Sequence, residues 1–243
     1  MTTIIRMKPY LRKVAIIGTT GSGKTTFLQA LAGPFRGAEV KRRVETEKLW
    51  EYMFTPVRNR HFFKSTTTMS MNVESINFVV TSANCFKFYS AKQKTYPVEE
   101  IDQLFPTVLV DTAGQDRLMF IPQIAVKGAH GVIIIADGTN ISSIERVSDY
   151  IKLAKNQEEI AGMEIPIIVF INKKDLEEEG VYVGKRAVDN WLLDSKISVH
   201  ESTVHDLDTF LVPLRNFLNK INGFPVPKEK YFGMNTQGTT AKK

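Results

Sequence analysis

The stretch KVAIIGTTGSGKTT, residues 13–26, decides the fold of this 243-residue chain. Lys13 to Ile17 is an apolar run of strand length, and the residues from Thr25 to Ala32 have a helical pattern. Between them, Gly18 to Thr25 fits G-x-x-x-x-G-K-[ST], a motif that requires a strand before it and a helix after it. We therefore expect a strand, a phosphate-binding loop and a helix in this order.

The residues of this loop predict how it would hold the phosphates of a nucleotide. Its glycines let consecutive backbone N–H groups curl around the phosphates, and the helix N-terminus adds the positive end of its dipole. Lys24 then reaches the β and γ oxygens, and Thr25 offers its hydroxyl to Mg²⁺. A glycine-rich turn that merely caps a helix is the alternative, and the flanking strand and helix argue against it. The predicted nucleotide contacts here are Gly18, Thr20, Gly21, Ser22, Gly23, Lys24, Thr25 and Thr26.

Short apolar runs alternate with helical patterns along the rest of the chain. Further strand-sized runs occupy 107–110, 132–136 and 167–171, and helical patterns occupy 117–127, 141–160, 185–194 and 206–221. Such runs are typical of buried parallel strands, and right-handed crossovers place helices on both faces of the sheet. The sequence therefore predicts a three-layer α/β domain with a mostly parallel sheet. Pro213 inside the last helical pattern predicts a kink or a later helix start.

One segment departs from the parallel pattern. From Thr68 to Ser75 apolar and polar residues alternate, which predicts a strand with one face in solvent. The apolar phase changes at Ile76, and we expect a bulge or turn near Ser75 because a slip of one residue exchanges the two faces. We also expect an antiparallel hairpin partner, so the sheet should carry one antiparallel edge strand.

A second motif, DTAGQ at 111–115, directly follows the apolar run 107–110. An aspartate at the end of a buried strand can hold Mg²⁺, which predicts this role for Asp111. The backbone N–H of Gly114 can approach the γ-phosphate, and Gln115 is placed to orient an attacking water. Ordinary loop residues are the alternative, which the correct order of two motifs makes a poor explanation.

A third motif, NKKD at 172–175, predicts the choice of base. The Asp175 carboxylate can accept hydrogen bonds from the guanine N1–H and 2-amino group, a donor pair that adenine lacks. The aliphatic part of Lys173 can lie along the base, and Asn172 can tie this loop to the phosphate loop. A charged, solvated loop is the alternative for this motif taken alone.

Together the three motifs resemble those of Ras-like small GTPases, and the resemblance covers about 11–221. It implies a P-loop NTPase domain in which a threonine of switch I, directly before the edge strand, closes on Mg²⁺ and the γ-phosphate. Thr68 best occupies that place, with Thr66 and Thr67 as neighbouring alternatives. The last nucleotide loop of the family, which approaches the guanine oxygen with backbone N–H groups, corresponds to Ser202, Thr203 and Val204.

The resemblance implies a molecular switch that binds GTP or GDP with Mg²⁺ and hydrolyses GTP slowly. The catalytic residues would be Gln115, Lys24 and Thr68, and the metal ligands Thr25, Thr68 and Asp111. Thr20 stands where many members have a glycine that leaves room for an arginine finger, which argues against that mode of activation. Effector, activating and exchange proteins are the implied partners. Two alternatives stay open: a GTP-binding scaffold that does not hydrolyse, and a GTPase that acts on the ribosome or RNA.

Two intervals are about twice as long as the family's usual ones, and they predict two insertions. Lys24 and Thr68 are 44 positions apart, and Thr68 and Asp111 are 43 apart. We place the insertions at about 35–64 and 81–105, where aromatic residues are frequent, as extra core or as a docking surface. The run Thr66 to Met71 is similar to prokaryotic Ras-like GTPases of the MglA kind. The polar tail at 225–243 predicts disorder.

Charge and composition limit the partners and the location. The net charge of +6 suits an anionic partner, and a nucleotide accounts for it without nucleic acid or an acidic membrane. Cys85 is the only cysteine, as expected in a reducing compartment, and we predict a cytoplasmic location. No apolar run approaches the roughly 18 residues of a membrane-spanning helix. Neither Thr2 nor the last four residues encode a lipid anchor.

Overall fold

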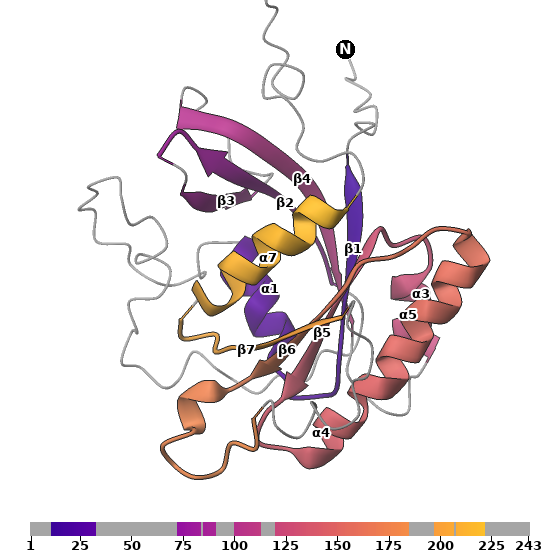
Figure 1. Ribbon diagram of the computed structural model, residues 1–243, viewed down its shortest axis with the longest axis vertical. Helices are drawn as coiled ribbons and strands as arrows, with labels where there is room; N and C mark the ends of the chain where they lie inside the picture. Colours follow the sequence, from indigo (N-terminus) through magenta and orange to yellow (C-terminus); the bar gives the residue numbers. More distant parts are fainter. Residues whose placement is uncertain are drawn as a thin grey trace, which may run out of the picture.

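In the part of the chain that the structure describes, a seven-stranded sheet forms the centre, in the order β3-β2-β4-β1-β5-β6-β7 (Figure 1). The computed structural model describes residues 11–32, 72–83, 85–90, 100–112, 120–184, 197–206 and 208–221, and the statements below concern these residues. The strands are β1 (Arg12–Ile17), β2 (Asn72–Thr81), β3 (Phe86–Ser90), β4 (Ile101–Asp111), β5 (Gly131–Asp137), β6 (Ile167–Asn172) and β7 (Ser198–Glu201).

Five strands form the predicted parallel part of the sheet. β1 pairs in parallel with β4 on one side and with β5 on the other, and β6 and β7 continue in the same direction. All residues of β5 and β6 are buried, because helices cover both faces of the sheet. The predicted α/β class with a mostly parallel sheet is confirmed.

The predicted antiparallel edge is present and is formed by the hairpin of β2 and β3. β2 runs antiparallel to β4, and β3 pairs with the outer side of β2. β3 and the first part of β4 lie within the second predicted insertion, 81–105, so this insertion extends the sheet by one strand. The insertion at 35–64, the helix expected at 185–194 and the tail at 225–243 lie outside the described residues.

The bulge predicted near Ser75 is wrong. The ladder between β2 and β4 keeps one register across Ser75, and its irregularity lies between Val80 and Thr81. Val73 is 59% exposed, whereas Ile76 is fully buried. The apolar phase of the sequence changes because Val73 lies on the solvent side at the start of the strand, and the backbone does not slip.

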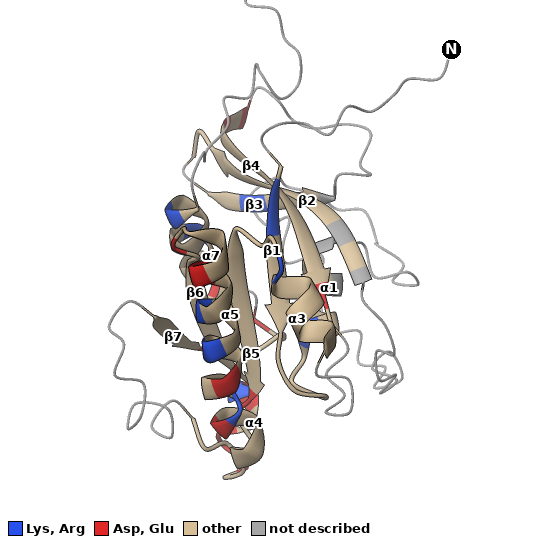
Figure 2. Cartoon of the chain, turned by 90° about the vertical axis from the view of Figure 1, so that its right-hand side faces the viewer, with Lys and Arg blue, Asp and Glu red and all other residues tan. Residues whose placement is uncertain are grey.

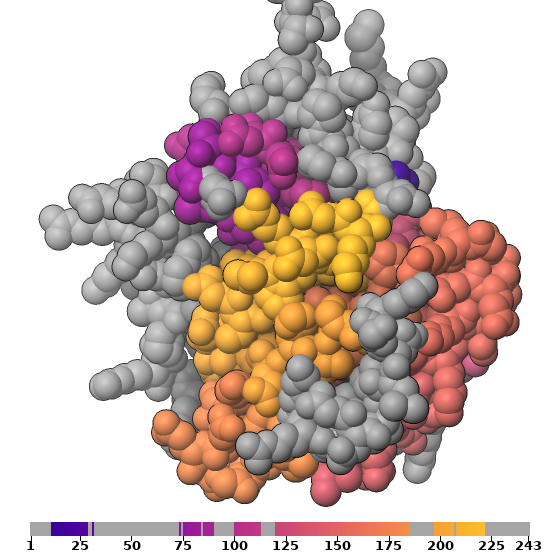
Figure 3. All heavy atoms as spheres, in the orientation of Figure 1, coloured from indigo at the N-terminus to yellow at the C-terminus, as the bar shows by residue number. Residues whose placement is uncertain are grey.

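Helices cover both faces of the sheet, as predicted. α1 (Lys24–Ala32) and α7 (Asp208–Lys220) pack on one face, and α3 (Phe120–Val126), α4 (Ile141–Glu145) and α5 (Val147–Ala161) pack on the other (Figure 1). The charged residues of α5, coloured along its ribbon in Figure 2, are exposed or partly exposed, whereas its buried residues are Val147, Tyr150, Ile151 and Ala154, as in an amphipathic helix. In the space-filling view α7 lies beside the atoms of the β2–β3 hairpin (Figure 3). Within the described ranges, no helix has the length and apolar character to cross a membrane.

Two helix boundaries differ from the prediction. The single helix expected over 141–160 is divided into α4 and α5 at Arg146, whose backbone N–H closes the last turn of α4. α7 begins at Asp208, where the Asp206 carboxylate accepts a hydrogen bond of 3.1 Å from the Asp208 backbone N–H. The helix therefore starts only slightly later than the predicted residue 206, and Pro213 stays inside the helix.

Three phenylalanine rings from three elements join the α1 and α7 layer to the sheet. The ring of Phe210 in α7 lies 4.7 Å from Phe27 in α1 and 4.7 Å from Phe170 in β6, measured between centroids. All three side chains are fully buried. α1 follows the phosphate loop, and β6 ends at Asn172. This cluster therefore fixes the position of the phosphate loop relative to the loop after β6.

We expect Phe210→Ala to lower the free energy of unfolding by about 3–5 kcal/mol, the usual effect of removing a buried ring. Chemical denaturation followed by circular dichroism measures this loss. Val212→Ala, on the exposed side of the same helix, is the matched control and should change stability by less than about 0.5 kcal/mol. Equal losses in the two variants would contradict the role given to the ring cluster.

Candidate nucleotide-binding site

The phosphate loop lies at the carboxyl edge of the sheet, between the end of β1 and the start of α1. It passes so close to the ends of β5 and β6 that two positions have no room for a side chain. A Cβ on Gly18 would lie 2.0 Å from the Ile135 carbonyl oxygen, and one on Gly23 would lie 2.3 Å from Asn172 Nδ2. Both glycines have positive φ, at 151° and 97°. The motif glycines therefore allow the close approach as well as the turn.

Lys24 is the first residue of α1 and is only 5% exposed. Its Nζ donates a hydrogen bond of 2.6 Å to the Thr19 carbonyl oxygen. Burial lowers the pKa of Lys24 from 10.5 to about 8, and the charge of Asp111 opposes part of this shift. A buried ammonium group favours a nearby anion, because a second negative group replaces the solvation that the ammonium has lost.

Thr25 and Asp111 bring the ends of two neighbouring elements together. Thr25 Oγ1 donates a hydrogen bond of 2.8 Å to Asp111 Oδ2, and Asp111 is the last, fully buried residue of β4. A hydroxyl and a carboxylate are hard oxygen donors of the kind that Mg²⁺ prefers. Among the described residues, no three His, Cys, Asp or Glu side chains gather to hold a metal. A Mg²⁺ held mainly by nucleotide phosphates needs only one or two protein ligands, so this pair fits the ion.

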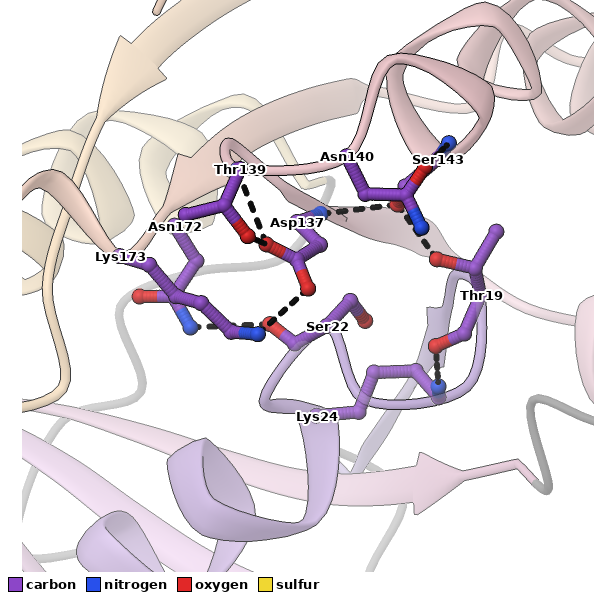
Figure 4. A network of polar contacts seen from close by, with 9 residues as sticks. All are labelled: Thr19, Ser22, Lys24, Asp137, Thr139, Asn140, Ser143, Asn172 and Lys173. Atoms are coloured by element: carbon purple, nitrogen blue, oxygen red, sulfur yellow. Dashed lines mark hydrogen bonds and ion pairs between the residues drawn. The ribbon is translucent and has the colours of Figure 1, made fainter. Parts of the chain in front are cut away.

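The end of β6 contacts the phosphate loop directly, as the sequence predicted. Asn172 is buried, and its Nδ2 donates a hydrogen bond of 2.9 Å to the Ser22 carbonyl oxygen. Lys173 follows with φ of 71°, and its Nζ forms an ion pair with Asp137 at the end of β5 (Figure 4). Among the described residues, Lys173 is the only non-glycine residue with positive φ.

Asp175 lies against the last predicted nucleotide loop. Thr203 Oγ1 donates a hydrogen bond of 2.6 Å to Asp175 Oδ1, and His205 Nε2 lies 3.7 Å from Asp175 Oδ2. The Lys174 backbone N–H donates to the carbonyl oxygen of Ser202 at 3.0 Å. The structure therefore joins 172–175 to the Ser202–Thr203 loop through both side chains and backbone.

Lys174 adds a charged contact between the same two loops. Its Nζ lies 2.8 Å from Glu201 Oε2, and this hydrogen bond raises the pKa of Lys174. The pair is partly exposed, so its contribution to stability is small. Its value here is geometric, because it holds the two loops side by side.

The remaining predicted site residues fall into two groups. Thr20 and Gly21 lie at the exposed tip of the phosphate loop, Thr26 lies in the first turn of α1, and Val204 is half-buried near Gly23. Thr68 with its neighbours Thr66 and Thr67, and also Gly114 and Gln115, lie outside the described residues. Their roles stay predictions from the sequence.

Sequence reasoning missed two polar residues that the structure places in the site. The Asp137 carboxylate accepts hydrogen bonds from the Thr139 backbone N–H at 3.0 Å and from Thr139 Oγ1 at 2.7 Å, and also pairs with Lys173. Ser143 Oγ bonds the Asp137 backbone N–H at 2.8 Å and also contacts Thr19 Oγ1 (Figure 4). Asp137 directly follows a buried apolar run, as Asp111 and Asn172 do. This position at the end of a predicted strand is the sequence signal that could have identified Asp137 as a site residue.

Comparison with known proteins finds similarity to the Ras family over part of the chain. Residues 87–203 match the model of the Ras family. The Ras-like protein rasU of Dictyostelium discoideum is 35% identical over 32% of this chain and 35% of its own length. The Ras-related protein RabC of the same organism is 38% identical over 34% and 41%, and human GTP-binding protein Rheb is 32% identical over 40% and 54%.

Fold and site define a P-loop α/β protein. The sequence matches go further, and over part of its length the chain is similar to Ras-like small GTPases. The chain spans about a third to a half of the length of these relatives. The family match begins after the phosphate loop, so the motif and the geometry of that loop are observations independent of this similarity.

A pH-dependent stability of the protein free of nucleotide and divalent ions follows from the buried Lys24. Its folded-state pKa of about 8 is below the unfolded value of 10.5, so between these values the unfolded chain holds a proton that the folded chain releases. The unfavourable contribution of Lys24 is therefore complete below pH 8 and disappears as the pH rises toward 10.5.

We expect the free energy of unfolding of the wild type, minus that of Lys24→Met, to rise by up to about 3 kcal/mol across this range. Denaturant titrations of both proteins at several pH values, in the presence of a chelator, measure the difference. A difference that stays flat or falls with pH would contradict the burial of the charged group.

Proposed function

We propose that the protein is a guanine-nucleotide switch that hydrolyses GTP slowly, with its GTPase domain at about 11–221. The observation that carries this proposal is the hydrogen bond from Asn172 Nδ2 to the Ser22 carbonyl oxygen, which sets the base loop against the phosphate loop. A ligand that fits both loops has a base at one end and phosphates at the other. The single cysteine, Cys85, is consistent with the cytoplasmic location that we propose.

Guanine is the proposed base because of the charge on Asp175. Two donors on one edge of guanine satisfy a carboxylate, whereas adenine leaves the charge without that donor pair. Thr203 Oγ1 already donates to one oxygen of this carboxylate, which supports its orientation for the base. The backbone of Ser202, Thr203 and Val204 is the proposed contact of the guanine oxygen.

Hydrolysis in the proposed mechanism depends on positioning and electrostatics. A water oxygen forms a bond to the γ-phosphorus, the bridging oxygen to the β-phosphate leaves, and GDP and phosphate result. Lys24 and the loop N–H groups stabilise the charge on the phosphate oxygens, and Gln115 orients the water. Mg²⁺, held by Thr25, Thr68 and Asp111, supplies further neutralisation of phosphate charge when bound.

The output of the proposed switch is a change of surface. Loss of the γ-phosphate removes the contacts proposed for Thr68 and Gly114, and the segments that carry them relax. Phe120 and Ile124 lie one turn apart on α3, directly after 113–119, and are 53% and 51% exposed. An exposed apolar pair beside a nucleotide-sensitive segment supports the proposal of effector, activating or exchange proteins as partners.

Nucleotide selectivity tests the proposed base contact. Protein stripped of nucleotide and offered equimolar GTP and ATP with Mg²⁺ should retain the guanine nucleotide. Asp175→Asn should weaken guanine-nucleotide affinity by about 10- to 100-fold, because a hydrogen bond to a charged group is lost. Chromatography of the bound nucleotide and competition binding measure both effects.

Asp149→Asn is the matched control, since this aspartate lies exposed on α5 and its carboxylate forms a surface pair with Lys152 at 3.7 Å. Its affinity should equal that of the wild type. Retention of ATP by the wild type, or equal effects of Asp175→Asn and Asp149→Asn, would exclude the proposed guanine site.

Hydrolysis of bound GTP tests the proposed role of Gln115. Gln115→Leu should slow single-turnover conversion of GTP to GDP by about 10²-fold, because the attacking water loses its orientation. Gln157→Leu on α5 is the matched control and should hydrolyse at the rate of the wild type. If the wild type holds GTP without hydrolysis, or if Gln115→Leu has no effect, the protein is a GTP-binding scaffold instead.

A further inference from the structure

The carbonyl oxygen of Ile171 is a point where two loops and a side chain meet. Ile171 directly precedes Asn172 at the end of β6. Its oxygen accepts the hydroxyl of Tyr182 at 3.1 Å and the backbone N–H of Ser202 at 2.9 Å, and Ser202 Oγ lies 3.5 Å away. We call 172–175 and the loop of Ser202 and Thr203 the two base loops. The Tyr182 hydroxyl bonds to the backbone directly before the first base loop, at the same carbonyl oxygen to which the second base loop is hydrogen-bonded.

The segment that carries Tyr182 is itself held against the end of β5. The Val183 backbone N–H donates to the Gly138 carbonyl oxygen at 2.8 Å, and the Gly138 N–H donates to the Asn172 carbonyl oxygen at 2.9 Å. The Tyr182 ring lies directly on Gly138, where an added Cβ would be 2.0 Å from Tyr182 Cε2. In Figure 1 this segment, in orange, ends beside the turn between β5 and α4.

Three loops at the carboxyl edge of the sheet thus meet around Tyr182 and the Ile171 carbonyl oxygen that its hydroxyl bonds. They are the turn after β5 with Gly138, the loop after β6 with Asn172 and Asp175, and the loop after β7 with Ser202. None of the sequence motifs contains Tyr182. Its side chain is half-buried, and its hydroxyl donates a hydrogen bond to a backbone carbonyl oxygen rather than to solvent.

We propose that Tyr182 is a positioning residue for guanine recognition, which holds the loop of Asp175 in register with the loop of Thr203 through the Ile171 carbonyl. This inference rests on the proposed function. Asp175 must present its carboxylate to two donors of the base at once, and such a bidentate contact is sensitive to small displacements. Loss of the phenol hydroxyl removes the direct hydrogen bond between the end of β6 and the 181–184 segment while the ring still fills its place.

The phenol keeps its donor proton at all pH values in which the protein would act. Burial raises the pKa of Tyr182, and the negative charges of Glu201 and Glu177 raise it further. The hydroxyl therefore acts as a constant hydrogen-bond donor and not as a titrating group. Glu201 also forms the ion pair with Lys174.

The test compares guanosine diphosphate with inosine diphosphate, whose base lacks the 2-amino group, on the full chain and on Tyr182→Phe. The ratio of the two affinities reports how well Asp175 is aimed at its two donors. We expect Tyr182→Phe to lower this ratio by about 3- to 10-fold, the equivalent of one hydrogen bond. Tyr89→Phe, a buried tyrosine on β3 at the far edge of the sheet, is the matched control and should keep the wild-type ratio.

A second variant approaches the same contact from its other side. Gly138→Ala places a methyl group against the Tyr182 ring and the Asn172 carbonyl oxygen, 2.6 Å away, and should lower the ratio without removing the hydroxyl. The double variant should lose less than the sum of the two single losses in free energy, because both changes act on one contact.

The outcomes separate the two proposals. A wild-type ratio in Tyr182→Phe, with guanine nucleotide still bound, overturns the role of Tyr182 and leaves the proposed function intact. An equal fall in Tyr89→Phe also overturns it, since a general loss of stability would then explain the effect. A wild type that does not prefer guanine over adenine nucleotides overturns the proposed function and this inference with it.

Discussion

The hydrogen bond between Asn172 Nδ2 and the Ser22 carbonyl oxygen sets the distance between the two halves of the site. It forms only because Gly23 has no side chain, since a Cβ there would occupy the place of the Asn172 amide. It also requires β6 and α1 to keep their relative positions, which the rings of Phe27, Phe170 and Phe210 fix from the core. Packing far from solvent therefore determines polar geometry at the edge of the sheet.

The lysine side chains at the same edge of the sheet differ in how well the protein compensates their charge. Burial disfavours the charged form of Lys24 and lowers its pKa, and the negative charge of Asp111 compensates only partly. Lys173 and Lys174, in contrast, each have a carboxylate partner, Asp137 and Glu201. The base side of the site is thus electrostatically satisfied in the protein alone, whereas the phosphate side holds a cation that an anion would stabilise.

Much of this arrangement could be predicted from the sequence, because apolar runs bounded by glycine, aspartate and asparagine determine both the strands and the loops after them. Local pattern was misleading where exposure, not register, changed the apolar phase, as at Val73. It also could not place a break inside one helical pattern at Arg146. No sequence motif identifies Tyr182, because its proposed role depends on a carbonyl oxygen and a glycine that only the fold brings to it.

The two sides of the site differ in how much they must rearrange when a ligand binds, and this difference suits the proposed switch. Lys173 adopts a left-handed backbone, which costs roughly 1–2 kcal/mol, and its ion pair with Asp137 offsets that strain before any base arrives. In the proposed switch, Lys24 instead exchanges the Thr19 carbonyl for phosphate oxygens. In the same proposal, base contacts on the preformed side contribute equally to GTP and GDP, so they supply affinity without favouring either state. Only the phosphate side of the proposed site then distinguishes the two nucleotides, and it is the side next to the segments proposed to move.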